Sequence, residues 1–377
     1  MADDFVPVNV PRLGEAEKRY LAECVDTGWI SSEGPFVSRL EQGMAQSCGR
    51  RHGVAVSSGT AALDVALAAL GIGPGDEVVL PSFTIISCVH QIVRSGAVPV
   101  FADCRPDTWC VDAATVEPCL TERTKAVMAV HIYGLPVDMD PLVRLCEERG
   151  LMLIEDAAQA IGLNCSGRAC GSFGLVSAMS FYPNKTVTTG EGGMVLTDDD
   201  QLAERCRSLR NLCFIPGRRF LHHELGWNYR MSNLQAAVGV AQMERMAETA
   251  ARKRAIGRRY AAALSDHPRL AMAPDAVDWA ENQYWAVGVL VMDKAGQPMD
   301  AGPVMAALKD RGIGTRPFFR PLHDQPALKE FLAPHQPACP EAERIAACGL
   351  YLPSGAGLTD AQADRSAEAL LAAMQTL

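Results

Sequence analysis

Between Val54 and about Thr197, short apolar segments alternate with helix-like segments. Each apolar segment is bounded by Gly, Pro, Asp or Ser, as is typical of buried strands. This alternation predicts an α/β domain whose sheet is mostly parallel, seven-stranded and flanked by helices. The predicted strands are residues 53–56, 77–80, 98–102, 126–131, 152–155, 176–181 and 193–196, and the predicted helices are residues 61–70, 86–95, 141–149 and 202–210.

Beyond Tyr229 the character of the sequence changes. Residues 232 to about 264 are rich in Ala, Glu and Arg and contain no Pro, with Gly239 and Gly257 as the only weak points. This composition predicts one long helix that could link two lobes.

We place the boundary between the two lobes near Ala250. This division gives a large domain of residues 1–250 and a smaller domain of residues 251–377, and 377 residues are enough for two cores. The smaller domain is predicted to be α+β, with the N-terminal stretch packed beside it. Its predicted elements are a strand at residues 284–291, a helix at residues 302–310 and a closing helix from Asp360.

The composition restricts the kinds of partner. The sequence is 48% hydrophobic and 21% charged, with a formal net charge of −9, as in ordinary soluble globular proteins. The negative charge does not favour nucleic acid or an anionic membrane. A phosphate-rich ligand would have to be held by local backbone amides and a few side chains.

The 13 cysteines are scattered and show no paired spacing of the zinc or redox kind, so no metal site is expected. Cys24, Cys48, Cys88 and Cys104 are interpreted as small buried residues. Residues 1–12 do not resemble a secretory leader, and no apolar run reaches the ~18 residues of a membrane span. We therefore expect the protein in a reducing cytoplasm.

The segment V-A-V-S-S-G-T-A-A-L, residues 54–63, joins an apolar strand to an Ala-rich helix. Free N–H groups of Gly59 and Thr60 at the start of the helix could bind a phosphate, and Gly allows its backbone to approach closely. The alternative is an ordinary Ser or Thr N-cap.

The segment L-I-E-D-A-A-Q-A-I-G, residues 153–162, is an apolar strand that ends in Glu155 and Asp156. Ligands of open α/β sheets bind at such strand ends. A carboxylate there could keep a heterocyclic nitrogen protonated, because a nearby opposite charge favours the ionised form. Alternatively, Asp156 only caps the next helix.

The segment S-F-Y-P-N-K-T-V-T-T-G-E-G-G-M-V, residues 180–195, is the most informative. Lys185 follows an apolar strand and has Tyr182 and Pro183 nearby rather than charges. In a partly dry pocket its pKa would fall below ~10.4, which frees the amine to form a Schiff base. The Ser180 hydroxyl could reach a phosphate. The alternative is a lysine that extends from a turn into solvent.

A phosphate cradle, a carboxylate and a Schiff-base lysine, in that order on one sheet, are what pyridoxal 5′-phosphate (PLP) requires of a protein. The sequence resembles the fold-type I PLP enzymes, and within them it is similar to the nucleotide-sugar aminotransferases, above all to the GDP-perosamine synthases. The segments that carry the resemblance are T-G-W-I-S-S-E-G-P-F from Thr27, S-S-G-T-A-A-L from Ser57, G-P-G-D-E-V-V-L-P-S-F-T from Gly73, H-I-Y-G from His131, E-D-A-A-Q-A from Glu155, N-K-T-V-T-T-G-E-G-G-M-V from Asn184, G-W-N-Y-R-M-S-N from Gly226 and R-P-F-F-R-P-L-H from Arg316.

The resemblance implies a catalytic role for two residues. Lys185 would carry the cofactor and move the proton, and Asp156 would pair with the pyridinium nitrogen. The amino donor would be L-glutamate, and the acceptor would be the C4 carbonyl of a nucleotide-linked 4-keto-6-deoxyhexose such as GDP-4-keto-6-deoxymannose. The product would serve polysaccharide biosynthesis.

The resemblance also implies the other contacts of the cofactor. Gln159 would lie against the ring or its hydroxyl. The phosphate would be held by the Gly59 and Thr60 amides, by the Ser180 hydroxyl and by Asn228 of a neighbouring subunit. Such a shared site would make the protein a homodimer.

Further positions match the sugar-nucleotide region of the family. They are Trp29, Ser31, Tyr229, Arg230, Arg316 and His323. For each of them, a packed or surface role is the alternative.

The sequence departs from the family pattern twice. Ile85 stands where many relatives have an aromatic residue that stacks on the cofactor ring, and Gln159 stands where perosamine-type relatives often have Glu. The identity of the sugar is therefore open, and UDP- or dTDP-linked keto sugars are alternatives.

The same residues argue against three other functions. A PLP-dependent sugar dehydratase would have His in place of Lys185, and a catalytically silent regulatory relative would not need Lys185, Asp156 and Ser180 together. A dinucleotide-binding dehydrogenase would have G-x-G-x-x-G after the first strand of the sheet, which this sequence lacks.

Overall fold

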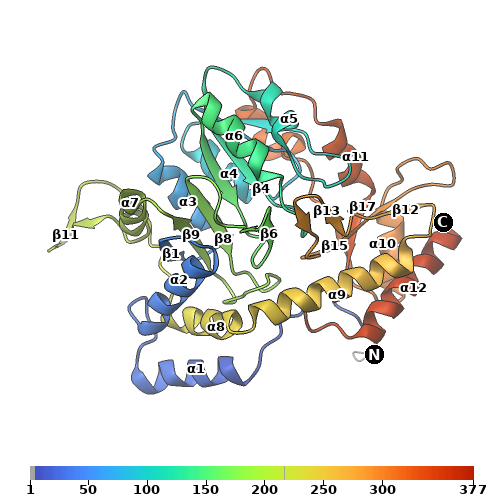
Figure 1. The fold of residues 1–377 in the computed structure, drawn as a ribbon, viewed down its shortest axis with the longest axis horizontal. Helices are drawn as coiled ribbons and strands as arrows, with labels where there is room; N and C mark the ends of the chain where they lie inside the picture. The colour runs from blue at the N-terminus through green and yellow to red at the C-terminus, as the bar shows by residue number, and fades with distance from the viewer. Residues whose placement is uncertain (1–4, 216) are drawn as a thin grey trace.

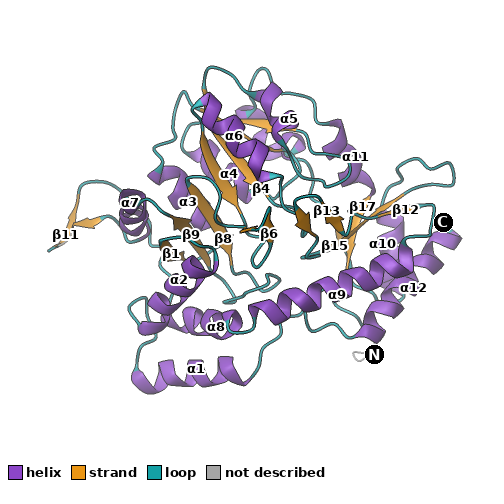
Figure 2. Cartoon of the chain, viewed as in Figure 1, coloured by secondary structure: helices purple, strands orange, loops and turns teal. Residues whose placement is uncertain are grey.

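The structure is a computed structural model that describes residues 5–215 and 217–377. It contains a seven-stranded sheet and a four-stranded sheet, with helices packed around both (Figures 1 and 2). Helix α9 (Met246–Leu264) runs along the molecule from the side of the large sheet to the side of the small one (Figure 1).

The large sheet has the strand order β1-β9-β8-β5-β4-β2-β3. Only β9 is antiparallel to its neighbours, so the predicted mostly parallel α/β sheet is confirmed. All seven predicted strands are present, each within two residues of its predicted ends. They are β1 (His52–Val56), β2 (Glu77–Pro81), β3 (Val98–Ala102), β4 (Thr124–Val130), β5 (Met152–Asp156), β8 (Val176–Ser180) and β9 (Gly193–Thr197).

The four helices predicted around this sheet are also present. Helix α3 packs against β8 and β9, α4 against β3, α6 against β5, and α7 against β1 and β9. Their bounds are Gly59–Ala69 for α3, Ser87–Arg94 for α4, Met139–Arg149 for α6 and Asp200–Arg210 for α7.

The small sheet is antiparallel and lies in the C-terminal part of the chain, where α+β structure was predicted. It packs with α10 (Gly302–Asp310), α12 (Asp360–Thr376) and α9 around a separate apolar core. Its strands are β12 (Leu270–Ala271), β15 (Val287–Val291), β16 (Arg316–Pro317) and β17 (Gly349–Leu352).

The N-terminal stretch contacts both sheets. Val6 joins the apolar core of the small sheet, and its backbone N–H donates to the Gly312 carbonyl at 2.8 Å. Further along, α1 (Glu15–Thr27) packs against α8 (Asn233–Met243), and α2 (Pro35–Ser47) packs against α8 and β1.

The single helix predicted for residues 232–264 is wrong, because the chain forms α8 and α9 with a break at Glu244 and Arg245. Arg245 leaves the helical conformation, with φ −121° and ψ 18°. Its guanidinium donates to the Arg12 carbonyl at 2.6 Å and pairs with Glu17 of α1. Tertiary contacts therefore hold the break, which no Gly or Pro marks in the sequence.

The remaining elements are short. They are α5 (Ala113–Val116), α11 (Pro340–Cys348), β6 (Asn164–Cys165), β7 (Arg168–Ala169), β10 (Phe214–Ile215), β11 (Arg218–His222), β13 (Ala276–Val277), β14 (Ala280–Glu281) and the 3-10 helices Glu117–Cys119, Leu322–Asp324 and Pro326–Phe331. The lobe boundary that we place near Ala250 falls inside α9 and stays a prediction. Among the described residues, no helix is both long and apolar enough to cross a membrane.

Candidate active site

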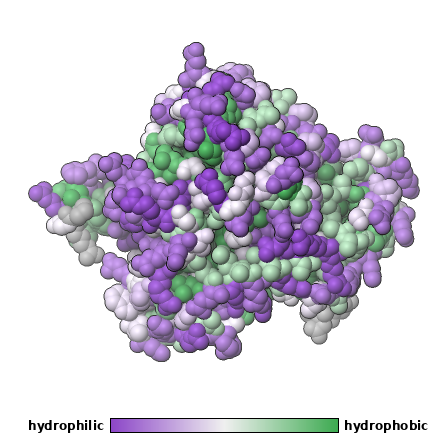
Figure 3. All heavy atoms as spheres, viewed as in Figure 1, coloured by the Kyte–Doolittle hydropathy of each residue, from purple (hydrophilic) through white to green (hydrophobic). Residues whose placement is uncertain are grey.

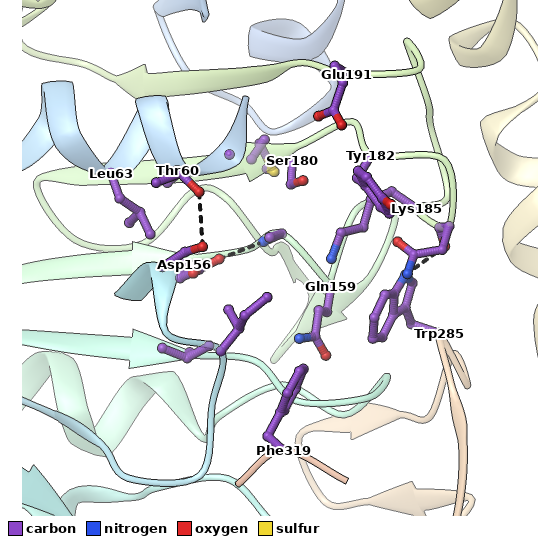
Figure 4. A pocket seen from close by; sticks show the side chains of 18 of the residues that line it. Thr60, Leu63, Asp156, Gln159, Ser180, Tyr182, Lys185, Glu191, Trp285 and Phe319 are labelled. Atoms are coloured by element: carbon purple, nitrogen blue, oxygen red, sulfur yellow. Dashed lines mark hydrogen bonds between the residues drawn. The ribbon is translucent and has the colours of Figure 1, made fainter. Parts of the chain in front are cut away.

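The carboxyl-terminal ends of β1, β5 and β8 lie at one edge of the large sheet, because β1 and β8 both run antiparallel to β9. A cavity of about 310 Å³ opens at this edge. Side chains from the strand ends, from the start of α3 and from the C-terminal part of the chain surround it (Figure 4). Seven of the predicted site residues line this cavity, namely Gly59, Thr60, Ile85, Asp156, Gln159, Ser180 and Lys185.

The start of α3 has both an N-cap and free backbone amides, the two alternatives that its sequence offers. The Ser58 hydroxyl caps the helix by accepting from the Ala61 amide at 3.0 Å. The Gly59 and Thr60 amides donate to no acceptor in the described part of the chain and border the cavity. A Cβ on Gly59 would lie 2.7 Å from the Ser180 Cβ, so only Gly allows this approach. The amides and the Ser180 hydroxyl together form a cradle that suits a phosphate.

Asp156 is the last residue of β5 and is 4% exposed, with its carboxylate at the cavity. One of its oxygens accepts from the Ala158 amide at 3.0 Å, and the other accepts from the Cys88 thiol at 3.2 Å. Two donors hold this carboxylate in one orientation, while its remaining lone pairs stay available to a ligand.

Lys185 lies in the loop between β8 and β9 and points into the cavity beside Gln159 (Figure 4). Its Nζ is 4.2 Å from the centre of the Trp285 ring. The indole N–H of Trp285 donates to the Asn184 carbonyl at 2.9 Å, which holds the ring against the amine.

Burial lowers the pKa of Lys185 to about 8, because removal of water disfavours the ammonium form. The nearby carboxylate of Asp156 and thiol of Cys88 act in the opposite direction and offset only part of this effect. The neutral amine, which is the nucleophilic form, is therefore available near neutral pH.

Gln159 is 5% exposed, and its side-chain carbonyl accepts from the Tyr133 amide at 2.8 Å. Its amide nitrogen contacts no acceptor among the described residues, so it can donate to a ligand in the cavity. Ile85 lines the same cavity and is 44% exposed. It offers an apolar surface to a ligand in the cavity.

The other predicted residues do not line this cavity within one chain. Asn228 is exposed on the surface, and its side-chain carbonyl accepts from Arg230 at 2.9 and 3.1 Å. Trp29 and Ser31 are exposed, and their backbone carbonyls accept from Asn233. None of these four residues lines the cavity in the single chain, and Arg230 instead lines a separate cavity together with Arg207 and Arg210.

The last three predicted residues also lie outside this cavity. Two of them contact other side chains, and the third lines a neighbouring cavity. The Tyr229 hydroxyl donates to Asp64 at 3.2 Å, and His323 lies within hydrogen-bonding distance of Ser82 at 2.6 Å. Arg316 lines a second cavity of about 720 Å³, which shares Tyr182, Asn184 and Tyr351 with the first cavity.

Aromatic residues of the C-terminal part complete the cavity and were missed in the sequence. They are Trp285, Phe319 and Tyr351. No local motif marks them, because they reach the site only when the small sheet packs against the large one. Tyr182, Ser87 and Glu191 also line the cavity.

Glu155 takes a different role from its neighbour Asp156. It lies with His131 and Cys170 in a buried group whose ligand atoms are close enough to hold a metal ion. However, His131 Nδ1 accepts from the Val137 amide at 3.1 Å, so the ring proton is on Nε2 and is donated to Glu155 at 2.9 Å. Glu155 also accepts from the Gly171 and Phe173 amides and the Ser177 hydroxyl.

These hydrogen bonds determine the charge of Glu155. Burial acts to raise its pKa, but the His131 side chain and the two amides outweigh that effect, so the pKa of Glu155 is lowered. The carboxylate is satisfied by protein donors, and the group fits a hydrogen-bonded core network.

The comparison with known families decides the identity of the chain. Residues 11–371 match the DegT/DnrJ/EryC1/StrS aminotransferase family. The chain belongs to this family of aminotransferases. The predicted fold-type I enzyme class is thereby confirmed, since the match covers nearly the whole sequence.

This aminotransferase is similar to curated relatives along almost its full length. It is 42% identical to the GDP-perosamine synthase of Caulobacter vibrioides over 97% of each chain. It is 40% identical to the GDP-perosamine synthase of Vibrio cholerae over 95% of this chain and 96% of the relative.

Solved structures show the same fold. The aminotransferase TlmJ of Streptoalloteichus hindustanus matches with a TM-score of 0.91 and 34% identity over 98% of this chain and 99% of its own. S. venezuelae DesV, solved in complex with a ketimine intermediate, matches with a TM-score of 0.86 and 32% identity over 96% and 98% of the two chains.

Proposed function

We propose that this aminotransferase binds PLP through Lys185 and transfers an amino group from L-glutamate to the C4 carbonyl of GDP-4-keto-6-deoxymannose or a closely related sugar. The observation that carries the proposal is one cavity lined by three kinds of group. They are the Lys185 amine with its lowered pKa, the Asp156 carboxylate, and the backbone amides of Gly59 and Thr60. The similarity to two GDP-perosamine synthases supports the choice of sugar.

The residues of the cavity fit the parts of the cofactor. The amides of Gly59 and Thr60 and the Ser180 hydroxyl suit the phosphate, and the close approach that only Gly59 permits keeps this cradle open. The Asp156 carboxylate suits the ring nitrogen, and the Gln159 amide nitrogen is free to donate to the ring hydroxyl.

When it is bound, PLP supplies an aldehyde that takes up the amino group and a ring that accepts electrons. The protein supplies the proton transfer, because the Lys185 amine can hold or release a proton near neutral pH. The Asp156 carboxylate stabilises positive charge at the ring nitrogen. Three aromatic residues from or next to strands of the small sheet line the cavity and would limit the access of water, namely Trp285, Phe319 and Tyr351.

We further propose that two copies of the chain share their sites. Asn228, Arg230, Trp29 and Ser31 lie outside the cavity of their own chain, where a partner could use them. The β10–β11 hairpin projects from the molecule in Figure 1, and Figure 3 shows hydrophobic residues on this projection. Leu221 is 44% exposed and Leu225, which follows the hairpin, is 95% exposed. A second copy would remove this apolar surface from water.

Amine transfer from glutamate to purified keto sugars tests the function. We expect turnover with the GDP-linked 4-keto-6-deoxy sugar, ping-pong kinetics, and loss of turnover in Lys185→Ala. Turnover with only UDP- or dTDP-linked sugars would reject the GDP-linked acceptor but keep the aminotransferase reaction. Turnover that persists in Lys185→Ala would contradict the assigned role of the lysine.

A further inference from the structure

Cys88 is a fully buried thiol in contact with the carboxylate at the cavity. It lies in the first turn of α4 and has no exposed surface. Its Sγ is 3.2 Å from Asp156 Oδ2, across the boundary between α4 and β5. Cys88 does not line the cavity itself, so a ligand would not touch it.

The direction of this hydrogen bond follows from its chemistry. An ionised carboxylate only accepts, so the thiol donates. Burial raises the pKa of Cys88 well above its ordinary value, and the charge of Asp156 raises it further, so the sulfur keeps its proton. The Thr84 hydroxyl is 3.4 Å from the same sulfur. Because the thiol proton is already donated to Asp156, the hydroxyl is the donor in this contact. Thr84 thus donates to Cys88, and Cys88 donates to the accepting carboxylate of Asp156.

The two contacts of Asp156 act on different oxygens. The Ala158 amide donates to Oδ1, and Cys88 donates to Oδ2. One donor on each oxygen fixes the rotation of the carboxylate plane. Without the thiol, the Ala158 amide would be the one remaining hydrogen-bond donor to this carboxylate among the described residues.

We propose that Cys88 is a positioning residue that orients the Asp156 carboxylate toward the ring nitrogen of the bound cofactor. This inference rests on the proposed function. A thiol is a weak donor, so it orients the carboxylate while leaving most of the negative charge for the ring nitrogen. The alternative is that Cys88 only fills space in the core.

Three substitutions separate these roles. Cys88→Ala removes the donor, Cys88→Ser restores a donor of similar size, and Cys88→Val fills the space without a donor. Cys165→Ala is the matched control, because the Cys165 thiol is equally buried and donates to a backbone carbonyl, that of Val137, at 3.5 Å.

The readouts are the PLP dissociation constant of the apoprotein, the pH midpoint of the absorbance of the lysine-bound cofactor, and the melting temperature without cofactor. For Cys88→Ala and Cys88→Val we expect a rise of about three- to tenfold in the dissociation constant, the size expected for one weak hydrogen bond to a charged group. The pH midpoint should rise as well, because a poorly placed carboxylate leaves less positive charge on the ring.

Cys88→Ser should restore both quantities to near the wild-type values, and Cys165→Ala should change only the melting temperature. The proposal is overturned if Cys88→Val binds PLP like the wild type, or if Cys88→Ser is as impaired as Cys88→Ala. Absence of lysine-dependent absorbance in the wild type would instead reject the proposed function itself.

Discussion

At the scale of single residues, the clearest distinction is between Glu155 and Asp156. Adjacent residues of a strand point to opposite faces. The carboxylate of Glu155 therefore enters the buried network with His131, and that of Asp156 faces the cavity. From the sequence, Asp156 was predicted as the carboxylate that faces a ligand at this strand end. The structure places Asp156 at the cavity.

Gly59 tests the phosphate cradle. In Gly59→Ala the new Cβ would lie 2.7 Å from the Ser180 Cβ, with the Ser180 backbone close behind, so the helix start must shift. We expect the PLP dissociation constant to rise at least about tenfold, or about 1.4 kcal/mol. Overpacking should also lower the free energy of unfolding by about 1–3 kcal/mol. Cofactor titration and chemical denaturation measure the two effects.

Gly73→Ala provides the control for this substitution. The nearest atom to its added Cβ is the Ser95 carbonyl oxygen at 3.6 Å, which is an ordinary contact. It should bind PLP like the wild type. Equal affinities in Gly59→Ala and Gly73→Ala would count against the cradle.

At the scale of secondary structure, the strands of the large sheet were predictable, because each is a short apolar segment between turn residues. The break between α8 and α9 was not. It depends on contacts of Arg245 with Arg12 and Glu17, which are more than 200 residues away in sequence. Trp285, Phe319 and Tyr351 were not predictable either, because they reach the cavity only through the packing of the two sheets.

Gly257 sits inside α9, where the sequence marks it only as a weak point. By helix propensity alone, Gly257→Ala would stabilise the helix by about 1 kcal/mol. However, the added Cβ would lie 2.0 Å from Tyr284 Cγ, and Tyr284 is buried. Because overpacking costs about 1–3 kcal/mol, we expect a net loss of stability.

Urea denaturation of Gly257→Ala measures this balance. A midpoint below that of the wild type agrees with close packing of α9 on Tyr284. A higher midpoint would mean that propensity dominates and that Tyr284 moves freely. A double variant, Gly257→Ala with Tyr284→Ala, should recover part of the loss that the single Gly257 substitution causes.

At the scale of the whole molecule, Lys253 links the parts of the chain. This buried amine of α9 donates to the carbonyls of Trp285 and Ser354, both at 3.1 Å. Burial, and to a smaller extent the charge of Lys185, lower the pKa of Lys253 to about 7. Trp285 therefore contacts both amines, Lys253 through its carbonyl and Lys185 through its ring.

Lys253 makes the stability of the apoprotein depend on pH. The pKa of Lys253 in the folded state lies below its unfolded value of about 10.4. As the pH falls from that value toward 7, the unfolded chain binds a proton at Lys253 and the folded protein does not, so the free energy of unfolding decreases. Between pH 9 and pH 8 this loss is about 1.4 kcal/mol per pH unit. In Lys253→Met, we expect the slope of unfolding free energy against pH to be smaller by that amount. Parallel slopes for the wild type and the variant would contradict a buried, deprotonated Lys253.

The complete site was predictable from the sequence only in part. The segments around Gly59, Asp156 and Lys185 carry local patterns, and the structure brings them to one cavity. The residues predicted for the sugar nucleotide lie outside this cavity in the single chain. Their roles stay predictions.

The central claim is that Lys185 holds the cofactor covalently. The most direct measurement is to incubate the protein with PLP, reduce it with borohydride, digest it and locate the modified lysine by mass spectrometry. We predict one modified site, Lys185, and no modification at this position in Lys185→Arg. A label on Lys253 or on a surface lysine, or no label at all, would contradict the claim.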